Sequence, residues 1–425
     1  MRKKGLLSLC VATLLCSNLQ ANSLEEKFTT LLQEHNLIKQ ANENVKSAKT
    51  KVDLEKTGWY PELGITLEAG RDNYDRSNSG STHQNVHATT AELNQLLWDF
   101  GALNASITKT KHGVTKAQAE LDRQKQYLLL SGLEAMIDLY SATKKYEFAQ
   151  ESESNIKKQT KLESARIQAG TGYTTDLLQA KSQLASAEAK RVEAQATLQK
   201  AQNRYKAVFK TDDYNVHQVS VTNIDSLIPK SLKEAADNAL QVNPDLQVSL
   251  SDTKIANAEI DRVQKTELAP KIKFVSKYAN DYNPDGATFR REQSNLGVQA
   301  TWKFNLGGKA FKAQAVALHN ASAQKEQLAD TQIKVVEATS NAWASLQSAM
   351  QRSQYLGNQA LILNQFLELA RKERELGKRS LLDVLTAETS LLNAKSDKMI
   401  ADSEVLKSKL NLLLQIAKLD VTILK

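Results

Sequence analysis

The sequence predicts a mainly α-helical protein with a small transmembrane β part, and three observations support this fold class. Proline is rare, so long stretches of the chain are free to be helical. Segments between these stretches alternate apolar and polar residues, as strands do. Both kinds of segment recur once, about 207 positions apart. A period of that length indicates a duplicated half of one architecture rather than a solenoid of small units.

The expected helices lie where proline is missing, from residue 62 to 228 and after residue 284. Residues 102–169 and 177–208 are rich in Ala, Leu, Lys, Gln and Glu, which are good helix formers. The first of these segments would extend roughly 100 Å as one helix. Gly113 and Gly132 are the two positions where it could break. Such lengths predict helical hairpins that coil on themselves.

The expected strands are two in each half. Residues 294–304 alternate cleanly and are long enough to cross a bilayer when tilted. The alternation is weaker in residues 86–98, and polar loops are expected at 71–85 and 280–293. The two shorter runs place apolar residues opposite polar ones: Ile65, Leu67 and Ala69 against Thr66, Glu68 and Gly70, and Ile272, Phe274 and Tyr278 against Lys271, Lys273 and Lys277. These lysines face either a barrel lumen or solvent.

Two glycine-containing segments predict the tight turns of the hairpins. Gly170 and Gly377 suit the left-handed position that ends a helix. Ser380, three residues before Asp383, is typical of an N-cap, and Thr174 or Thr175 is the equivalent in the first half. Each segment therefore predicts helix, turn, helix.

The first 21 residues have the pattern of a secretory signal peptide. Arg2, Lys3 and Lys4 precede a short apolar stretch and a small-residue cleavage site at 19–21. Both cysteines of the chain, Cys10 and Cys16, lie in this segment, so an exported chain would depend on packing or oligomerisation rather than disulfides. Removal of the segment lowers the formal net charge from +8 to +5, and no dense basic block indicates nucleic acid as a partner.

Four strands are too few to close a membrane barrel. An open sheet edge in lipid leaves backbone hydrogen-bonding groups unpaired, so several copies must pool their strands. Trp59, Trp98 and Trp302 lie near strand ends, as in the aromatic girdle of such barrels.

An ordered set of motifs at the repeat spacing resembles the TolC family of outer-membrane efflux proteins over essentially the whole mature chain. The motifs are Pro61 and Pro270 at strand entries, Leu97-Trp-Asp-Phe-Gly101, Asn243-Pro-Asp-Leu246 and Gly377-Lys-Arg-Ser-Leu-Leu-Asp-Val-Leu. The resemblance implies a homotrimer in the Gram-negative outer membrane and its lipid. The trimer shares an antiparallel β-barrel with four strands per protomer, continued by a long α-helical barrel across the periplasm. It also implies a passive conduit that docks with a periplasmic adaptor (membrane fusion) protein and an inner-membrane transporter.

The resemblance also implies roles for residues at the hairpin turns. Asp383 corresponds to a pore-lining carboxylate ring and Arg379 to a cationic latch, with Asp176 and Thr175 as its partner on the neighbouring hairpin. Gly170 and Gly377 mark the tips that contact the adaptor. The chain departs from the family pattern at two further gate positions: Thr386 replaces a second ring carboxylate and Arg374 a latch tyrosine.

Simpler interpretations stay open for these residues. A carboxylate such as Asp383 in the first turn of a helix is stabilised by the helix dipole without any pore. Asp176 and Arg379 could form an unrelated surface pair of little energetic value. His83 and His87 have the spacing of metal ligands, but they lie in a Ser/Asn-rich segment without an acidic third ligand, so no metal or other cofactor is expected.

The predicted organisation has four parts: the signal peptide 1–21, a first repeat 22–215 with its tip near 170–176, a linker 216–230, and a second repeat 231–425 with its tip near 377–383. The favoured function is a trimeric outer-membrane exit channel of a tripartite efflux or type I secretion system, gated at its periplasmic tips. One alternative is a soluble periplasmic coiled-coil scaffold or adaptor, and a weaker one a siderophore- or metal-handling outer-membrane factor. No nucleophile–base pairing indicates an enzyme.

Overall fold

The computed structural model describes residues 24–76, 80–214, 216 and 224–424. The predicted signal peptide 1–21, both cysteines and positions 217–223 of the predicted linker lie outside the described residues.

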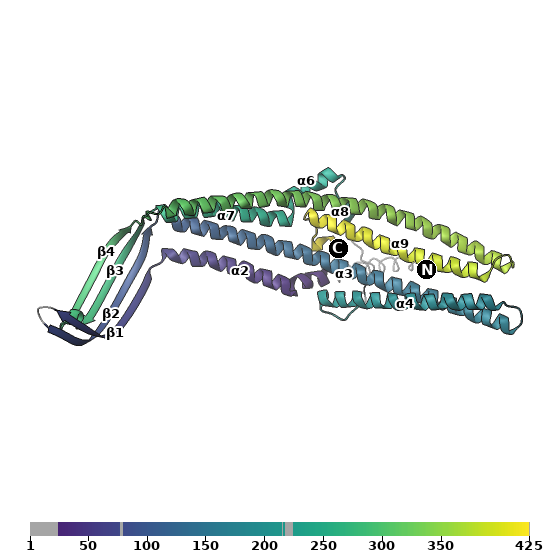
Figure 1. The fold of residues 1–425 in the computed structure, drawn as a ribbon. Coiled ribbons are helices and arrows are strands. Elements are labelled where there is room, and N and C mark those ends of the chain that lie inside the picture. The colour runs from purple at the N-terminus through teal and green to yellow at the C-terminus, as the bar shows by residue number, and fades with distance from the viewer. Residues whose placement is uncertain (1–23, 77–79, 215, 217–223, 425) are drawn as a thin grey trace, which may run out of the picture. The chain divides into compact units, whose positions relative to one another are not determined.

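The described chain is mainly helical with a single small antiparallel sheet, which confirms the predicted fold class (Figure 1). None of its helices combines the length and apolarity of a membrane span within these residues. The elements are α2 (Asn36–Lys56), η1 (Thr57–Trp59), β1 (Glu62–Arg76), β2 (Gly80–Trp98), α3 (Ala102–Gln168), α4 (Thr174–Phe209), α5 (Ile224–Leu227), α6 (Leu232–Val242), α7 (Pro244–Leu268), β3 (Lys271–Tyr282), η2 (Pro284–Gly286), β4 (Arg290–Thr301), α8 (Lys309–Glu375), α9 (Leu381–Gln415) and η3 (Val421–Leu424).

The chain divides into two compact units, and each takes residues from both halves of the sequence. The helical unit contains the described residues of Met1–Lys39, Asp122–Pro244 and Gln332–Lys425. The sheet unit contains Gln40–Leu121 and Asp245–Thr331. α3 and α8 contribute to both units.

The sheet has the order β1-β2-β3-β4, so β1 and β4 form its edges. β1 and β2 pair from Glu62 opposite Asn94 to Arg76 opposite Gly80. The predicted loop 71–85 is therefore wrong over most of its length, and the predicted loop 280–293 is shorter, because β3 continues to Tyr282 and β4 begins at Arg290. Polar residues pair in a ladder as well as apolar ones, since the ladder bonds are between backbones.

The long helices match between the two halves. α3 and α8 contain 67 residues each and begin 207 positions apart, at Ala102 and Lys309. α4 and α9 begin at Thr174 and Leu381, also 207 apart. The division into two repeats stays a prediction, although these lengths agree with it.

Alanine at every seventh position packs the hairpins of the helical unit. The buried alanines are Ala180, Ala187, Ala194 and Ala201 in α4, and Ala387, Ala394 and Ala401 in α9. A seven-residue repeat keeps one seam of a helix facing its neighbour as the helices coil. Because alanine is small, the backbones can approach closely along this seam.

α3 runs through Gly113 and Gly132 without a break, and Gly132 is required for packing. A Cβ at Gly132 would lie 2.7 Å from Cε1 of Phe28, a fully buried ring, and close to Leu31 and Phe209. We expect Gly132→Val to destabilise the protein by about 1–3 kcal/mol, because the buried neighbours cannot all move away. Thermal unfolding followed by helical circular dichroism measures this effect.

The matched control is Gly113→Ala on the same helix. A Cβ at Gly113 meets no atom within 4 Å. Replacement by the better helix former should raise stability by about 0.5–1 kcal/mol. Equal effects of the two substitutions would contradict the packing role of Gly132.

Candidate functional site

Both hairpin turns lie at the same end of the helical unit (Figure 1). Gly170 and Gly377 have φ of +73° and +74°, the left-handed conformation that glycine adopts most easily. In each turn the glycine N–H donates to the carbonyl three residues back, at 2.9 Å. The next N–H donates to the carbonyl five residues back, also at 2.9 Å. This is the Schellman arrangement, and it fixes both turns in the same shape.

The N-cap prediction is right for one hairpin and wrong for the other. Ser380 caps α9, and its Oγ accepts from the N–H of Asp383 at 3.1 Å. In the first hairpin the N-cap is Tyr173, which makes no side-chain capping bond, and Thr174 is already helical. The α3–α4 turn uses a threonine differently, since Thr171 Oγ1 donates to the Arg166 carbonyl.

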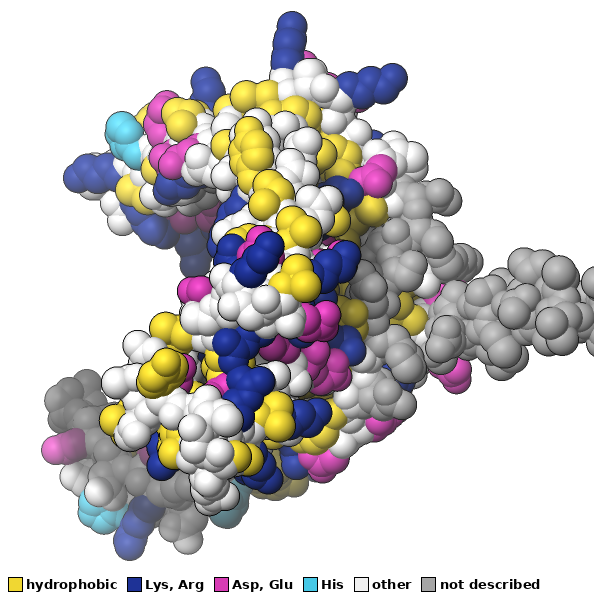
Figure 2. Space-filling model, turned by 90° about the vertical axis from the view of Figure 1, so that its right-hand side faces the viewer, with side chains coloured by type: hydrophobic (Ala, Val, Ile, Leu, Met, Phe, Trp, Pro, Cys, Tyr) yellow, Lys and Arg dark blue, Asp and Glu magenta, His cyan; other side chains and the backbone are white. Residues whose placement is uncertain are grey.

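The predicted carboxylates lie in the first turns of the two returning helices. Asp383 and Thr386 are exposed on α9, while on α4 Thr175 is exposed and Asp176 is half-buried. Among the described residues, no ion pair forms with the side chain of either aspartate. Both positions benefit from the positive end of the helix dipole. The face seen from this end carries basic and acidic side chains interspersed with hydrophobic ones (Figure 2).

Arg379 is held within its own hairpin. Its Nε lies 2.6 Å from Oε2 of Glu373 in the last turn of α8, and its guanidinium lies 5.1 Å from the centre of the Phe366 ring. The structure therefore does not bring Arg379 together with Asp176 in one chain. A half-buried guanidinium fixed by a carboxylate and a ring is a preorganised cationic group.

Arg374 joins two elements through a carboxylate that sequence reasoning missed. One amino group donates to the carbonyl oxygen of Arg379 at 3.1 Å, and the other lies 3.5 Å from Oε1 of Glu163 on α3. Only 4% of the Glu163 side chain is exposed. Arg166, one turn along α3, contacts the same oxygen at 3.0 Å. No sequence signal points to Glu163, because its partner is 211 positions away.

Glu388 forms a second buried link at this end of the unit. Its Oε1 accepts from Asn155 on α3 at 2.6 Å and from Arg371 on α8 at 3.3 Å. Sequence could have indicated it, because Glu388 shares a helix face with Leu385 and Leu391. A charged residue on an apolar face needs a buried partner.

The sheet unit has one apolar and one polar face. Alternate residues of the edge strands, Leu63, Ile65 and Leu67 on β1 and Leu296 and Val298 on β4, share a face by their register. They are strongly exposed, Leu67 at 74% and Leu296 at 73%. Trp98 and Trp302 mark the end of the sheet nearest the helices, and both are more than half exposed. Such a face is stable only when something apolar covers it.

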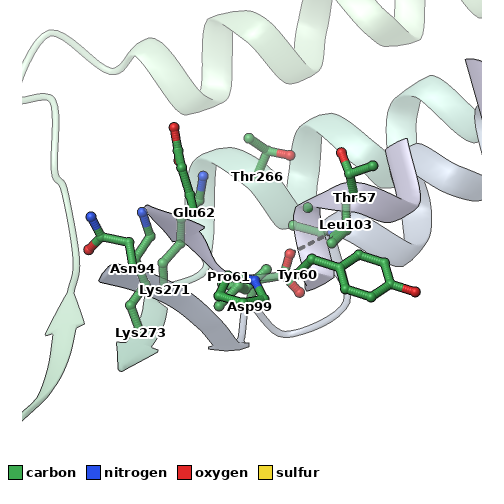
Figure 3. A pocket seen from close by; sticks show the side chains of 13 residues that line it. Thr57, Tyr60, Pro61, Glu62, Asn94, Asp99, Leu103, Thr266, Lys271 and Lys273 are labelled. Atoms are coloured by element: carbon green, nitrogen blue, oxygen red, sulfur yellow. Dashed lines mark hydrogen bonds between the residues drawn. The ribbon is translucent and has the colours of Figure 1, made fainter. Parts of the chain in front are cut away.

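The opposite face carries the predicted lysines. Lys277 lies opposite Glu92 in the register of β2 and β3. Glu62, Asn94, Lys271 and Lys273 line a cavity of about 650 Å³ where the sheet meets the helices of this unit. Figure 3 shows these four side chains projecting to the same side, with Asp99 below them.

Asp99 is buried, and its side chain has a structural role at the start of α3. Its two oxygens accept from the N–H groups of Gly101 and Leu103, at 3.1 and 2.6 Å, and so begin α3. Figure 3 shows Asp99 with Leu103. Asn305 does the same for Gly307 before α8, at 2.9 Å.

His83 and His87, which have the spacing of metal ligands, lie on β2 rather than in a loop. His83 is paired with Asn73, and His87 with Ala69 and Tyr282. Within the described residues, no group of three or more His, Cys, Asp or Glu side chains could hold a metal ion.

Comparison with known proteins decides the family. The outer membrane efflux protein family matches residues 29–208 and 235–416, most of the chain. The chain belongs to the outer membrane efflux protein family. Its members are outer membrane channels rather than enzymes, so this family member is placed in the outer membrane and extends into the periplasm. This placement decides against the soluble scaffold.

Individual relatives are distant but cover the chain. The outer membrane efflux protein BepC of Brucella suis biovar 1 (strain 1330) is 23% identical over 88% of this chain and 78% of its own length. The outer membrane protein TolC of Escherichia coli (strain K12) is 22% identical over 86% of this chain and 76% of its own. The outer membrane channel CmeC of Campylobacter jejuni has the same fold, with a TM-score of 0.80 at 15% identity, over 94% of this chain and 87% of its own.

Proposed function

We propose that this family member is a trimeric exit channel of a tripartite efflux or type I secretion system, closed at rest by its hairpin turns. The observation that carries the proposal is the open four-stranded sheet with an exposed apolar face. Lipid would cover that face, and other copies would pair the backbone groups at the β1 and β4 edges. Three copies would contribute twelve strands, an even number within the range of bacterial outer-membrane barrels.

Exposed apolar side chains on the helical unit support assembly as well. The residues on α8 are Ile333, Tyr355, Leu361, Ile362 and Leu369, each more than half exposed in one chain. A surface of this kind on one long helix indicates contact with another protein surface. Neighbouring copies would cover it in a helical barrel.

The gate proposal assigns the turn residues. Asp383 from three copies would form a ring of negative charge at the closed end, and Thr386 would add no second ring. Arg379 would be the cationic latch, reaching Asp176 and Thr175 of a neighbouring copy. The Gly170 and Gly377 turns would be the parts that the periplasmic adaptor touches, and an inner-membrane transporter would load the conduit. Both partners are proposed from the family alone.

Arg379→Ala should raise the open probability of single channels in planar bilayers at least about fivefold, because it removes from each copy a charge pair worth roughly 1 kcal/mol. Lys378→Ala is the control, since Lys378 is exposed in the same turn and only its backbone bonds appear among the described contacts. A channel whose closed state is unaffected by Arg379→Ala would count against the latch. A protein that conducts no ions in any variant would count against the channel itself.

A further inference from the structure

Glu163 is an unusual residue for the end of a long hairpin. It is almost fully buried, yet its partners come from two different helices, Arg166 on its own helix and Arg374 on α8. Burial of a carboxylate is unfavourable unless charged donors compensate, and removal of one donor leaves the charge poorly compensated. The position of Arg374 relative to α3 is therefore energetically coupled to Glu163.

Arg374 also contacts the α8–α9 turn. The same guanidinium that contacts Glu163 donates to the backbone carbonyl of Arg379, at 3.1 Å. α3 is thus connected through Glu163 and Arg374 to the residue proposed as the latch. A displacement of the α8–α9 turn away from α3 beyond the reach of the Arg374 side chain breaks the contact to Glu163 or the contact to Arg379. Among the described ion pairs, none connects Arg374 to Asp176.

We propose that Glu163 is a positioning residue that fixes the α8–α9 turn against α3 through Arg374, and so holds the closed tip within each chain. The inference rests on the proposed gate function. It assigns a role within one chain, whereas the Arg379 latch acts between copies. Opening would then require a break inside each protomer as well as a break between protomers.

The test uses the full-length protein and two readouts. Tyr173 and Lys378 are exposed at the two turns, and Tyr173 makes no side-chain capping bond, so both positions can carry spin labels after replacement by cysteine. Glu163→Gln keeps the shape of the side chain and removes its charge. It should lengthen or broaden the distance between the labels and raise the open probability at least about tenfold, since each copy would lose one charge-assisted hydrogen bond.

Two further variants separate positioning from simple stability. Arg166→Gln removes the partner on the same helix but keeps the link to α8, so the label distance and conductance should match the parent. Arg374→Gln should also open the tip, and Glu163→Gln should open it no further in that background, because Glu163 acts through Arg374.

The outcomes distinguish the two proposals. An unchanged label distance in Glu163→Gln would overturn the positioning role, and so would additive effects of Glu163→Gln and Arg374→Gln in the double variant. Absence of conductance in every variant, with label distances that still respond to Glu163→Gln, would overturn the channel function and leave the positioning role supported.

Discussion

Leu296→Arg should prevent most of the protein from assembling in the outer membrane. Leu296 is 73% exposed near the middle of β4, in the same row of the sheet as Leu63 and Leu93. An arginine on the lipid face near the bilayer midplane costs about 2–4 kcal/mol, and the proposed trimer would contain it three times. The measurement is the fraction of protein recovered from outer membranes as an oligomer that resists detergent until heated.

Asn295→Arg is the matched control on the neighbouring residue. Asn295 points to the polar face, opposite Lys277, and Glu92 on the next strand offsets the added charge. This variant should assemble nearly as well as the parent. If both variants assembled equally, the apolar face would not be the lipid face and the proposed barrel would be wrong.

The sequence was informative where a rule is local. Missing proline and good helix formers predicted residues 102–169 and 177–208 as helices, and the structure has α3 and α4 there within a few residues. Gly170 and Gly377 have the expected left-handed conformation, because few other residues adopt it without strain. Alternation predicted the apolar face of the sheet, because side chains in a strand alternate with period two.

The sequence was less informative about strand length. Residues 71–85 contain Ser, Asn and Gly, which favour turns, yet most of them pair in β1 and β2. Turn propensity is local, whereas strand pairing is decided by the partner strand. The same limit explains why neither Thr174 nor Thr175 caps α4. Both residue types suit the role, but the N-cap position is occupied by Tyr173.

The candidate site could be predicted only in part. A residue with a local role can be predicted from spacing alone. Ser380 is an example, because its Oγ caps α9 by accepting from the N–H of Asp383. Glu163 could not be predicted in this way, because its contact partner Arg374 comes from a distant part of the chain. The roles proposed for Asp383, Arg379 and Asp176 rest on contacts between copies in the proposed trimer, and they stay predictions.

Glu259→Gln should destabilise the helical part of the sheet unit. Glu259 on α7 accepts from Arg262 through both oxygens, at 2.7 Å each, and Lys109 on α3 lies 3.0 Å away. These charges lower the pKa of Glu259 from 4.5 to about 2, against partial desolvation, and its side chain is 27% exposed. The shift corresponds to at most about 3 kcal/mol at neutral pH.

The direction of the pH dependence follows from this lowered pKa. The folded state binds the proton more weakly than the unfolded state, so the stabilisation is complete above pH 4.5 and is lost as pH falls through about 2. Thermal unfolding should therefore show Glu259→Gln well below the parent at pH 7, and the difference should shrink between pH 4.5 and 2. Asp261→Asn removes an exposed pair with Lys265 on the same helix and should cost less than about 1 kcal/mol at any pH. A difference between Glu259→Gln and the parent that stays constant down to pH 2 would show that shape, not charge, makes Glu259 stabilising.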